Sequence, residues 1–218
     1  RKAVTIGGGG AVAAVAGGAP RGGGPPPHRG GRGPAPPPDA GRGARPEIQQ
    51  LLNAMDGIVP AYVYGPAMDI LAWNTLGTRL GIDYAAIPEE RRNGPLLVFL
   101  DPRLQELHPN WAEVADDTVA GLRAETGRHP GSSRVCRVTH ELLERSEEFR
   151  RRWEAQAVQE RTRGVKRFRH PEAGELVLRF EAFVLPADPG QMLCTYTADE
   201  GSATAEALKV LAGAAAVA

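Results

Sequence analysis

Apolar and polar residues alternate along the last third of the chain, in residues 164–202. Within 175–185 every second position is apolar, and residues 191–198 repeat that pattern. A period of two is typical of β-strands. The intervening stretches 171–174 (PEAG) and 186–190 (PADPG) hold the proline and glycine that tight turns require. We therefore predict three strands joined by short turns into an antiparallel meander.

The start of the folded region combines a helical pattern with two shorter strands. From Pro46 to Gly57, apolar residues recur on one face of a short amphipathic helix, with the glycine as its stop. Residues 61–64 (AYVY) and 69–73 (DILAW) follow, separated by Gly65 and the proline after it. These two segments predict a β-hairpin.

Helical spacing dominates the middle of the chain. Residues 91–95 (RRNGP) predict irregular structure before the apolar run 96–100, and apolar positions then recur at three- and four-residue spacing after Asn110. Further helices are predicted over residues 133–145, after Ser146 and at the C-terminal end. Residue types that favour helix N-caps stand at Asn74, Asn110, Ser132, Ser133, Ser146 and Ser202.

The predicted order is a helix, two strands, several helices, three strands and a final helix. We expect an α+β domain in which the two N-terminal and three C-terminal strands form one antiparallel sheet. The middle helices would cover one face of that sheet.

Composition divides the chain in two. Residues 1–46 contain seven Lys or Arg, one acidic residue, fourteen Gly and nine Pro, whereas the remainder has nineteen basic and twenty-five acidic residues. A segment that is half Gly and Pro buries too little apolar surface to offset its ordering entropy. We predict a disordered tail or linker over 1–45, a globular domain over 46–213 and a short tail over 214–218. Because the chain begins with Arg1 and not with Met, we also expect a fragment of a longer product, with 1–45 a linker or an out-of-frame segment.

Cysteine content and hydropathy bear on the compartment. Cys136 and Cys194 are far apart and belong to no pairing motif, which indicates a reducing environment. No apolar run approaches the ~20 residues of a membrane span. We expect a cytoplasmic protein without a membrane association.

Several local patterns suggest other functions, and each has a simpler interpretation. Residues 8–13 match a dinucleotide-type GxGxxA, but a Pro- and Gly-rich tract follows in place of a second strand. The same region resembles a weak signal peptide whose apolar core is interrupted by glycines. Arginine and lysine runs at 150–152 and 166–170 raise the alternative of nucleic-acid binding, although the domain is acidic overall. We interpret both runs as solvated or partner-facing surface.

Catalytic and metal-binding patterns are weak. The chain has no GxSxG motif, and His140 and Glu144 at i, i+4 lack a third ligand. Asp116 and Asp117 are adjacent on a helix and are interpreted as surface charge. We expect no catalytic residue, no bound metal and no cofactor; a small enzyme would need a polar constellation that the sequence does not supply.

Six motifs stand in order along the folded region: PAYVYGPAMDILAWN (60–74), FLDP (99–102), HPNW (108–111), RSEEF (145–149), GVKRFRHPEAG (164–174) and YTADEGSATAEAL (196–208). Together they resemble the MmyB-like ligand-binding domain, a family found C-terminal to an XRE-type helix-turn-helix domain in bacterial transcription regulators. The resemblance covers about residues 46–213.

The resemblance implies a PAS-like fold, a small apolar ligand of the fatty-acid class, no catalysis, and DNA binding only through an N-terminal domain. Residues 1–45 contain no helix-turn-helix pattern, so that domain is expected to be missing from this chain. The sequence departs from the family pattern at Pro66-Ala67, Gly94-Pro95 and Gln156-Ala157.

Aromatic residues are the expected lining of the ligand pocket. A dimerisation module with a solid core and no cavity is the alternative interpretation, and a homodimer is compatible with either. The predicted pocket residues are Tyr62, Trp73, Phe99, Trp111, Phe149, Trp153, Phe180 and Tyr196.

Overall fold

The computed structural model describes residues 43–155 and 162–213. The tail over residues 1–42, the GxGxxA stretch, Gln156-Ala157 and the C-terminal tail therefore lie outside the described residues. The elements in chain order are α1 (Pro46–Met55), β1 (Ala61–Tyr64), η1 (Pro66–Met68), β2 (Ile70–Trp73), α2 (Thr75–Thr78), η2 (Tyr84–Ala86), η3 (Glu89–Arg91), α3 (Gly94–Leu100), α4 (Pro102–Leu107), α5 (Trp111–Arg128), α6 (Ser133–Arg145), α7 (Glu147–Glu154), β3 (Arg163–His170), β4 (Gly174–Val184), β5 (Met192–Thr197) and α8 (Ala203–Gly213).

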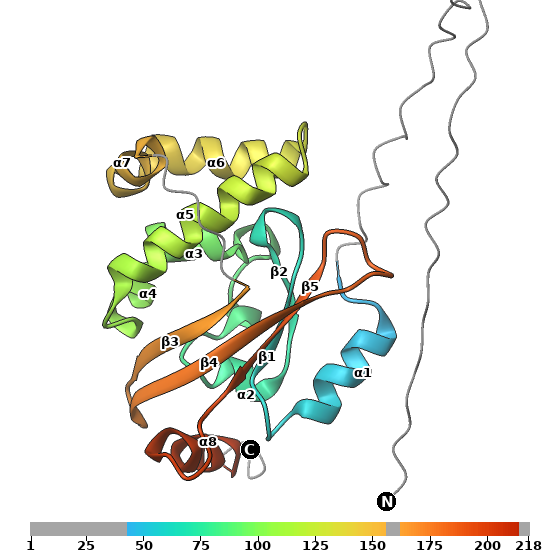
Figure 1. Ribbon diagram of the computed structural model, residues 1–218, viewed down its shortest axis with the longest axis vertical. Helices are drawn as coiled ribbons and strands as arrows, with labels where there is room; N and C mark the ends of the chain where they lie inside the picture. Colours follow the sequence, from blue (N-terminus) through green and yellow to red (C-terminus); the bar gives the residue numbers. More distant parts are fainter. Residues whose placement is uncertain (1–42, 156–161, 214–218) are drawn as a thin grey trace, which may run out of the picture. The chain divides into compact units, whose positions relative to one another are not determined.

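A five-stranded antiparallel sheet with the order β2-β1-β5-β4-β3 forms the centre of the domain (Figure 1). The central pairing joins the two ends of the sequence, with Tyr62 of β1 opposite Cys194 of β5. On the other side of β5, Phe180 of β4 is opposite Tyr196. The α+β class and the sheet built from two N-terminal and three C-terminal strands are thus confirmed.

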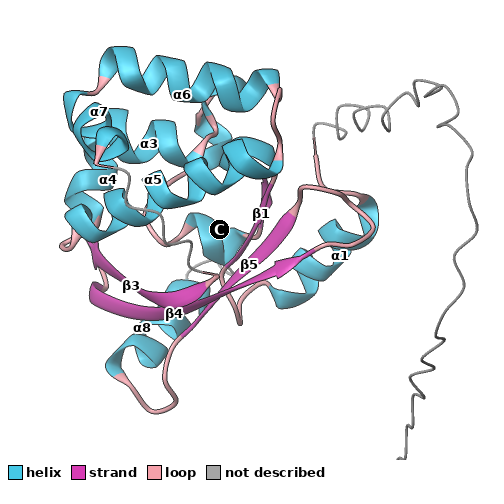
Figure 2. Ribbon diagram, turned by 45° about the horizontal axis from the view of Figure 1, so that its top comes forward, coloured by secondary structure: helices cyan, strands magenta, loops and turns pink. Residues whose placement is uncertain are grey.

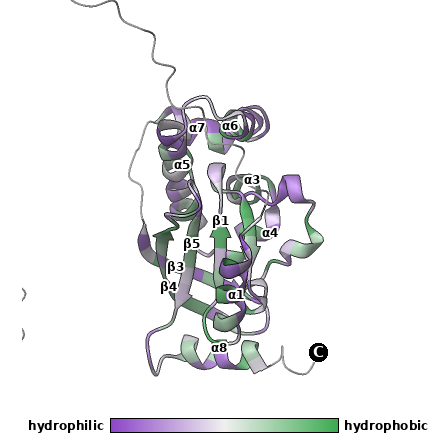
Figure 3. Cartoon of the chain, turned by 90° about the vertical axis from the view of Figure 1, so that its right-hand side faces the viewer, coloured by the Kyte–Doolittle hydropathy of each residue, from purple (hydrophilic) through white to green (hydrophobic). Residues whose placement is uncertain are grey.

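Helices α3 to α7 lie over one face of the sheet, and α1 packs against the other face (Figure 2). Ile48 and Leu52 of α1 form a small core with Val63 and Leu193 from the back of the sheet. In Figure 3, α6 and α7 lie at one end of the domain and α8 at the other, with the strands between them. The middle helices therefore cover one face of the sheet, as predicted, and α1 covers part of the other face.

Most predicted helix caps are confirmed. The side chains of Asn74, Ser132, Ser146 and Ser202 each accept a hydrogen bond from a backbone N–H in the first turn of the following helix. Asn110 stands at the predicted N-cap position of α5, but its side chain makes no capping bond and its amide donates to the Glu113 carboxylate at 2.8 Å. Ser133 is not a cap but the first residue of α6.

The interpretation of residues 91–95 as irregular needs correction. Helix α3 begins at Gly94, and the side chain of Asn93 accepts a bond of 3.0 Å from Leu96 N. Pro95 fits the first turn of a helix because that turn needs no intrahelical N–H donor. Gly94 and Pro95 thus start this helix instead of interrupting one.

Candidate functional site

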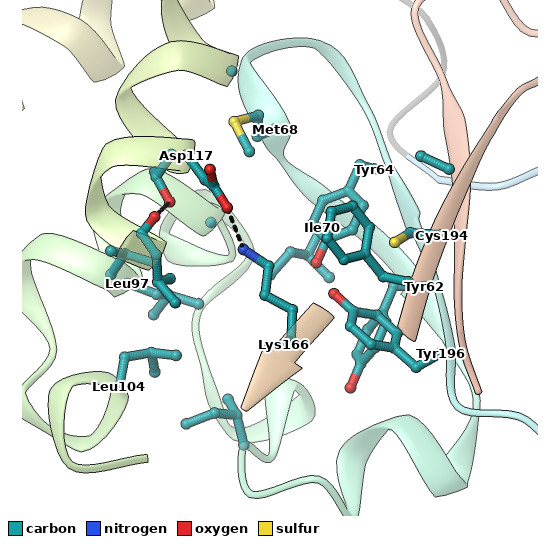
Figure 4. A pocket seen from close by; sticks show the side chains of 18 of the residues that line it. Tyr62, Tyr64, Met68, Ile70, Leu97, Leu104, Asp117, Lys166, Cys194 and Tyr196 are labelled. Carbon is teal, nitrogen blue, oxygen red and sulfur yellow. Dashed lines mark hydrogen bonds and ion pairs between the residues drawn. The ribbon is translucent and has the colours of Figure 1, made fainter. Parts of the chain in front are cut away.

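A cavity of about 200 Å³ lies between the sheet and helices α3, α4 and α5. All five strands contribute to one wall, and the cavity-facing stripe of α5 contributes the opposite wall (Figure 4). Most of the lining is apolar or aromatic, which is typical of sites for small organic ligands.

Tyrosines dominate the sheet wall. Tyr62 lies 5.5 Å from Tyr196 and 5.7 Å from Tyr84 between ring centroids, both in edge-on packing, and Tyr64 lies 6.3 Å from Tyr62. Burial raises the pKa of all four phenols well above the ordinary range. Their hydroxyls therefore stay neutral near pH 7 and act as uncharged hydrogen-bonding groups. The hydroxyl of Tyr62 is already committed, because it donates to the Gly77 carbonyl at 2.6 Å.

Helix α5 presents a narrow stripe to the cavity. Val114, Asp117, Thr118, Gly121 and Glu125 all line it, at the three- and four-residue spacing that places side chains on one helix face. Met68 packs closely against Gly121 at the centre of the stripe: a β-carbon there would lie only 3.2 Å from the Met68 sulfur, closer than ordinary van der Waals contact. The helix wall thus combines a close contact with Met68 at its middle with polar groups on both sides of it.

Two ion pairs supply the polar part of the lining. Lys166 Nζ lies 3.3 Å from Asp117 Oδ2, and the two side chains are only 16% and 23% exposed. At the other pair, Arg128 contacts Glu125 Oε1 at 2.7 Å, and Glu125 Oε2 accepts a bond of 3.2 Å from Ala67 N. Each cationic side chain in the lining therefore contacts a carboxylate that also lines the cavity.

His108 completes the polar set at the end of α4. Its Nδ1 donates to the Arg167 carbonyl at 2.9 Å, because a carbonyl oxygen can only accept. Burial lowers the pKa of His108, and the positive charge of Lys166 acts in the same direction. The imidazole is therefore neutral near pH 7 and carries an acceptor at Nε2.

The structure places three of the eight predicted pocket residues in the cavity lining: Tyr62, Phe180 and Tyr196. Trp73 instead packs against Tyr84, with ring centroids 5.4 Å apart, and carries the Arg92 guanidinium over its ring.

The other four predicted residues belong to the core of the helix layer. Phe149 is fully buried, with ring centroids 5.1 Å from Phe99 and 5.4 Å from Trp153, and Phe99 contacts Trp111 at 5.8 Å. Their position follows from the two-layer arrangement of the helices, in which α3 and α5 are buried on the side of α6 and α7 as well as on the side of the sheet.

Sequence reasoning missed Lys166, Asp117 and His108. The interpretation of Asp117 as surface charge was wrong, whereas Asp116 is exposed and pairs with Arg152. Two signals were available: Asp117 lies one turn from Val114 and Gly121, and Lys166 shares the inward period of Phe168 on β3.

The remaining charged motifs form local pairs. Arg151 and Arg152 of the first basic run both contact Glu148, at 2.6 and 2.7 Å. His140 and Glu144 form an exposed pair at 3.1 Å.

Within residues 43–155 and 162–213, no three His, Cys, Asp or Glu side chains are placed to hold a metal ion. In the same two stretches, no helix has both the length and the apolar character needed to cross a bilayer.

Comparison with known protein families identifies the family of this chain. The family model described as the MmyB-like transcription regulator ligand binding domain matches residues 44–211, which include every element from α1 to β5 and most of α8. No curated protein matches the chain.

Proposed function

Because the chain belongs to the family of MmyB-like transcription regulator ligand-binding domains, we propose that its cavity binds a small amphiphile with an apolar, fatty-acid-like body. Occupancy of the cavity would then regulate transcription. The family is one of regulators, and the proposed role needs no catalytic step. Such a regulator acts where the DNA is, in the bacterial cytoplasm, and DNA would be contacted by another part of the regulator.

The cavity between the sheet and α5 is the observation that carries this proposal. Four neutral tyrosines and the side chains of Ile70, Leu97 and Phe180 offer an apolar ligand a largely apolar surface. Burial of an apolar chain against such a surface contributes roughly 25 cal/mol per Å². The alternative of a dimerisation module with a solid core is less favoured, because a solid core would leave no such space between sheet and helices.

We propose that the loop between β1 and β2 transmits a conformational change from the cavity to the helices at the outer surface. Met68 lines the cavity, and Ala67 and Met68 both adopt the left-handed region, with φ of 59° and 61°. Non-glycine residues hold this conformation only when their surroundings impose it. A ligand that pushes Met68 would therefore act on a strained loop, and through it on the helices that hold it.

A pair of glycines on α5 provides the test. In Gly121→Leu the new side chain must displace Met68, whose sulfur would lie 3.2 Å from the new β-carbon, and the two side chains then compete with a ligand for the cavity; in Gly127→Leu the new side chain meets open space, with no atom within 4 Å of the new β-carbon. Both changes raise helix propensity by a similar amount. We expect decanoic acid, decan-1-ol or methyl decanoate to raise the melting temperature of the wild-type chain and of Gly127→Leu, and to leave Gly121→Leu unchanged. Native mass spectrometry of the three proteins would count bound molecules. Equal binding to both variants, or no binding to any of the three proteins, would contradict the proposal.

A further inference from the structure

We propose that the cavity selects ligands whose polar end is uncharged, such as a hydroxyl, an ester or an amide, over ligands that end in a carboxylate. This inference rests on the proposed function and specifies the chemistry of its ligand. It depends on the two ion pairs in the lining, Lys166 with Asp117 and Glu125 with Arg128.

The charges of the lining residues sum to zero. The lining contains two cationic side chains, two carboxylates and a histidine that burial keeps neutral. Each cation faces a carboxylate of the same lining, so neither positive charge is left for a ligand to neutralise. A carboxylate that entered the cavity would add a net negative charge to a partly enclosed, mostly apolar space. Such a charge is costly to desolvate without a partner of its own.

Hydrogen-bonding capacity is nevertheless left over near Lys166. Its ammonium group has three N–H donors, and the contact with Asp117 Oδ2 uses one of them. Neutral His108 has an acceptor at Nε2, because its proton is on the nitrogen that faces Arg167. A hydroxyl could both donate and accept here, and an ester or amide carbonyl could accept from Lys166. An uncharged group can therefore use these atoms without separating Lys166 from Asp117.

The contact between Lys166 and Asp117 should also distinguish ligands by geometry, since it joins β3 to α5 across the cavity (Figure 4). A carboxylate would compete with Asp117 for the same ammonium group. Removing the Asp117 charge would leave Lys166 unneutralised, and the preference should then shift toward the carboxylate.

The test compares methyl decanoate with decanoic acid at pH 7.5 on the full chain, by calorimetric titration. The two probes differ in hydrophobicity, so the decisive quantity is the change in the ester-to-acid affinity ratio between variants. We expect Asp117→Asn to shift this ratio at least tenfold toward the acid. The neighbouring variant Asp116→Asn removes the same charge from an exposed position on the same helix, and it should leave the ratio within threefold of wild type.

Other outcomes separate the inference from the proposed function. If the wild-type chain binds the acid more tightly than the ester, or if Asp117→Asn and Asp116→Asn give the same ratio, the preference for an uncharged end is wrong while the ligand site stands. If no probe binds the wild-type chain, both proposals fail. Should Asp117→Asn not fold, Lys166→Gln offers the opposite change: it removes the cation and should shift the ratio at least threefold toward the ester. An unchanged ratio in Lys166→Gln would also contradict the inference.

Discussion

Arg134 of α6 binds Asp69 at the end of the β1–β2 loop through two parallel hydrogen bonds of 2.6 and 2.8 Å. This contact joins the outermost helix layer to the loop that carries Met68 into the cavity. Asn93 strengthens the junction, because its amide donates to Asp69 Oδ1 at 2.9 Å and to the Ala67 carbonyl at 2.8 Å. The loop is therefore held from α3 and α6 at once, in the left-handed conformation of Ala67 and Met68.

We predict that Arg134→Met lowers the free energy of unfolding by about 1–2 kcal/mol, as expected for a partly buried bidentate pair that loses one partner. Both side chains are less than a quarter exposed, so water screens the pair only in part. Urea denaturation followed by circular dichroism would measure the change.

Arg179 and Asp199 offer a matched control for that measurement. They form a second two-bond pair, at 2.6 and 3.0 Å, but both side chains are more than 60% exposed. Arg179→Met should leave the stability unchanged within error. Equal losses in the two variants would contradict the role given to Arg134.

The sheet could be predicted from the sequence because its information is local. The period of two in β4 places Leu176, Leu178 and Phe180 on the covered face, and the structure has all three there. Turn residues at both ends of β4 fixed the order of the meander. The sequence predicts that both groups of strands join in one sheet, but the pairing of β1 with β5 comes from the structure.

The cavity lining could be predicted only in part, since it depends on which distant elements face each other. Helical period shows that Phe149 and Trp153 are buried, but it does not say whether they face the sheet or another helix. Charged residues gave a further difficulty. Lys166 and Asp117 are 49 positions apart, and each alone resembles a surface residue; only their contact across the cavity gives them a shared role.

Substitutions of Phe149 and Phe180 should distinguish the role of the helix core from the role of the cavity. Phe149 is fully buried among aromatic rings, whereas Phe180 lines the cavity and is partly exposed. We predict that Phe149→Leu lowers the free energy of unfolding by roughly 1–2 kcal/mol and changes affinity for methyl decanoate less than twofold. The same substitution at Phe180 should weaken that affinity about fivefold or more, at a smaller cost in stability. Loss of affinity in Phe149→Leu alone would contradict this assignment.

Stability should fall above pH 9, because several buried acids must ionise when the chain unfolds. Burial raises the pKa of the Cys194 thiol to about 11, against an ordinary value of 9.0. The unfolded chain therefore loses this proton first, and the stabilisation, complete below pH 9, is lost as the pH rises toward 11. For Cys194 this loss is on the order of 3 kcal/mol, and the raised pKa values of the buried tyrosines add to it at higher pH.

The contribution of Cys194 can be isolated from the slope of the free energy of unfolding against pH. Cys194→Ala should flatten the decline in the free energy of unfolding between pH 9 and 11, whatever its effect at pH 7. Exposed Cys136 provides the control, and Cys136→Ala should keep the wild-type slope. Parallel slopes in all three proteins would show that the Cys194 thiol is not protected in the folded state.

Between pH 7 and 5 the titration of buried His108 should contribute to the pH dependence of stability. Burial lowers its pKa, and nearby Lys166 lowers it further, while the bond to the Arg167 carbonyl opposes both. Its stabilising contribution is complete above the ordinary histidine pKa of 6.5 and is lost as the pH falls below that value, because the unfolded chain then binds the proton more readily. In His108→Asn the amide can replace Nδ1 as donor to Arg167 but cannot titrate. We therefore expect this variant to lose less stability between pH 7 and 5 than wild type, whereas His140→Asn, which alters an exposed histidine, should behave as wild type.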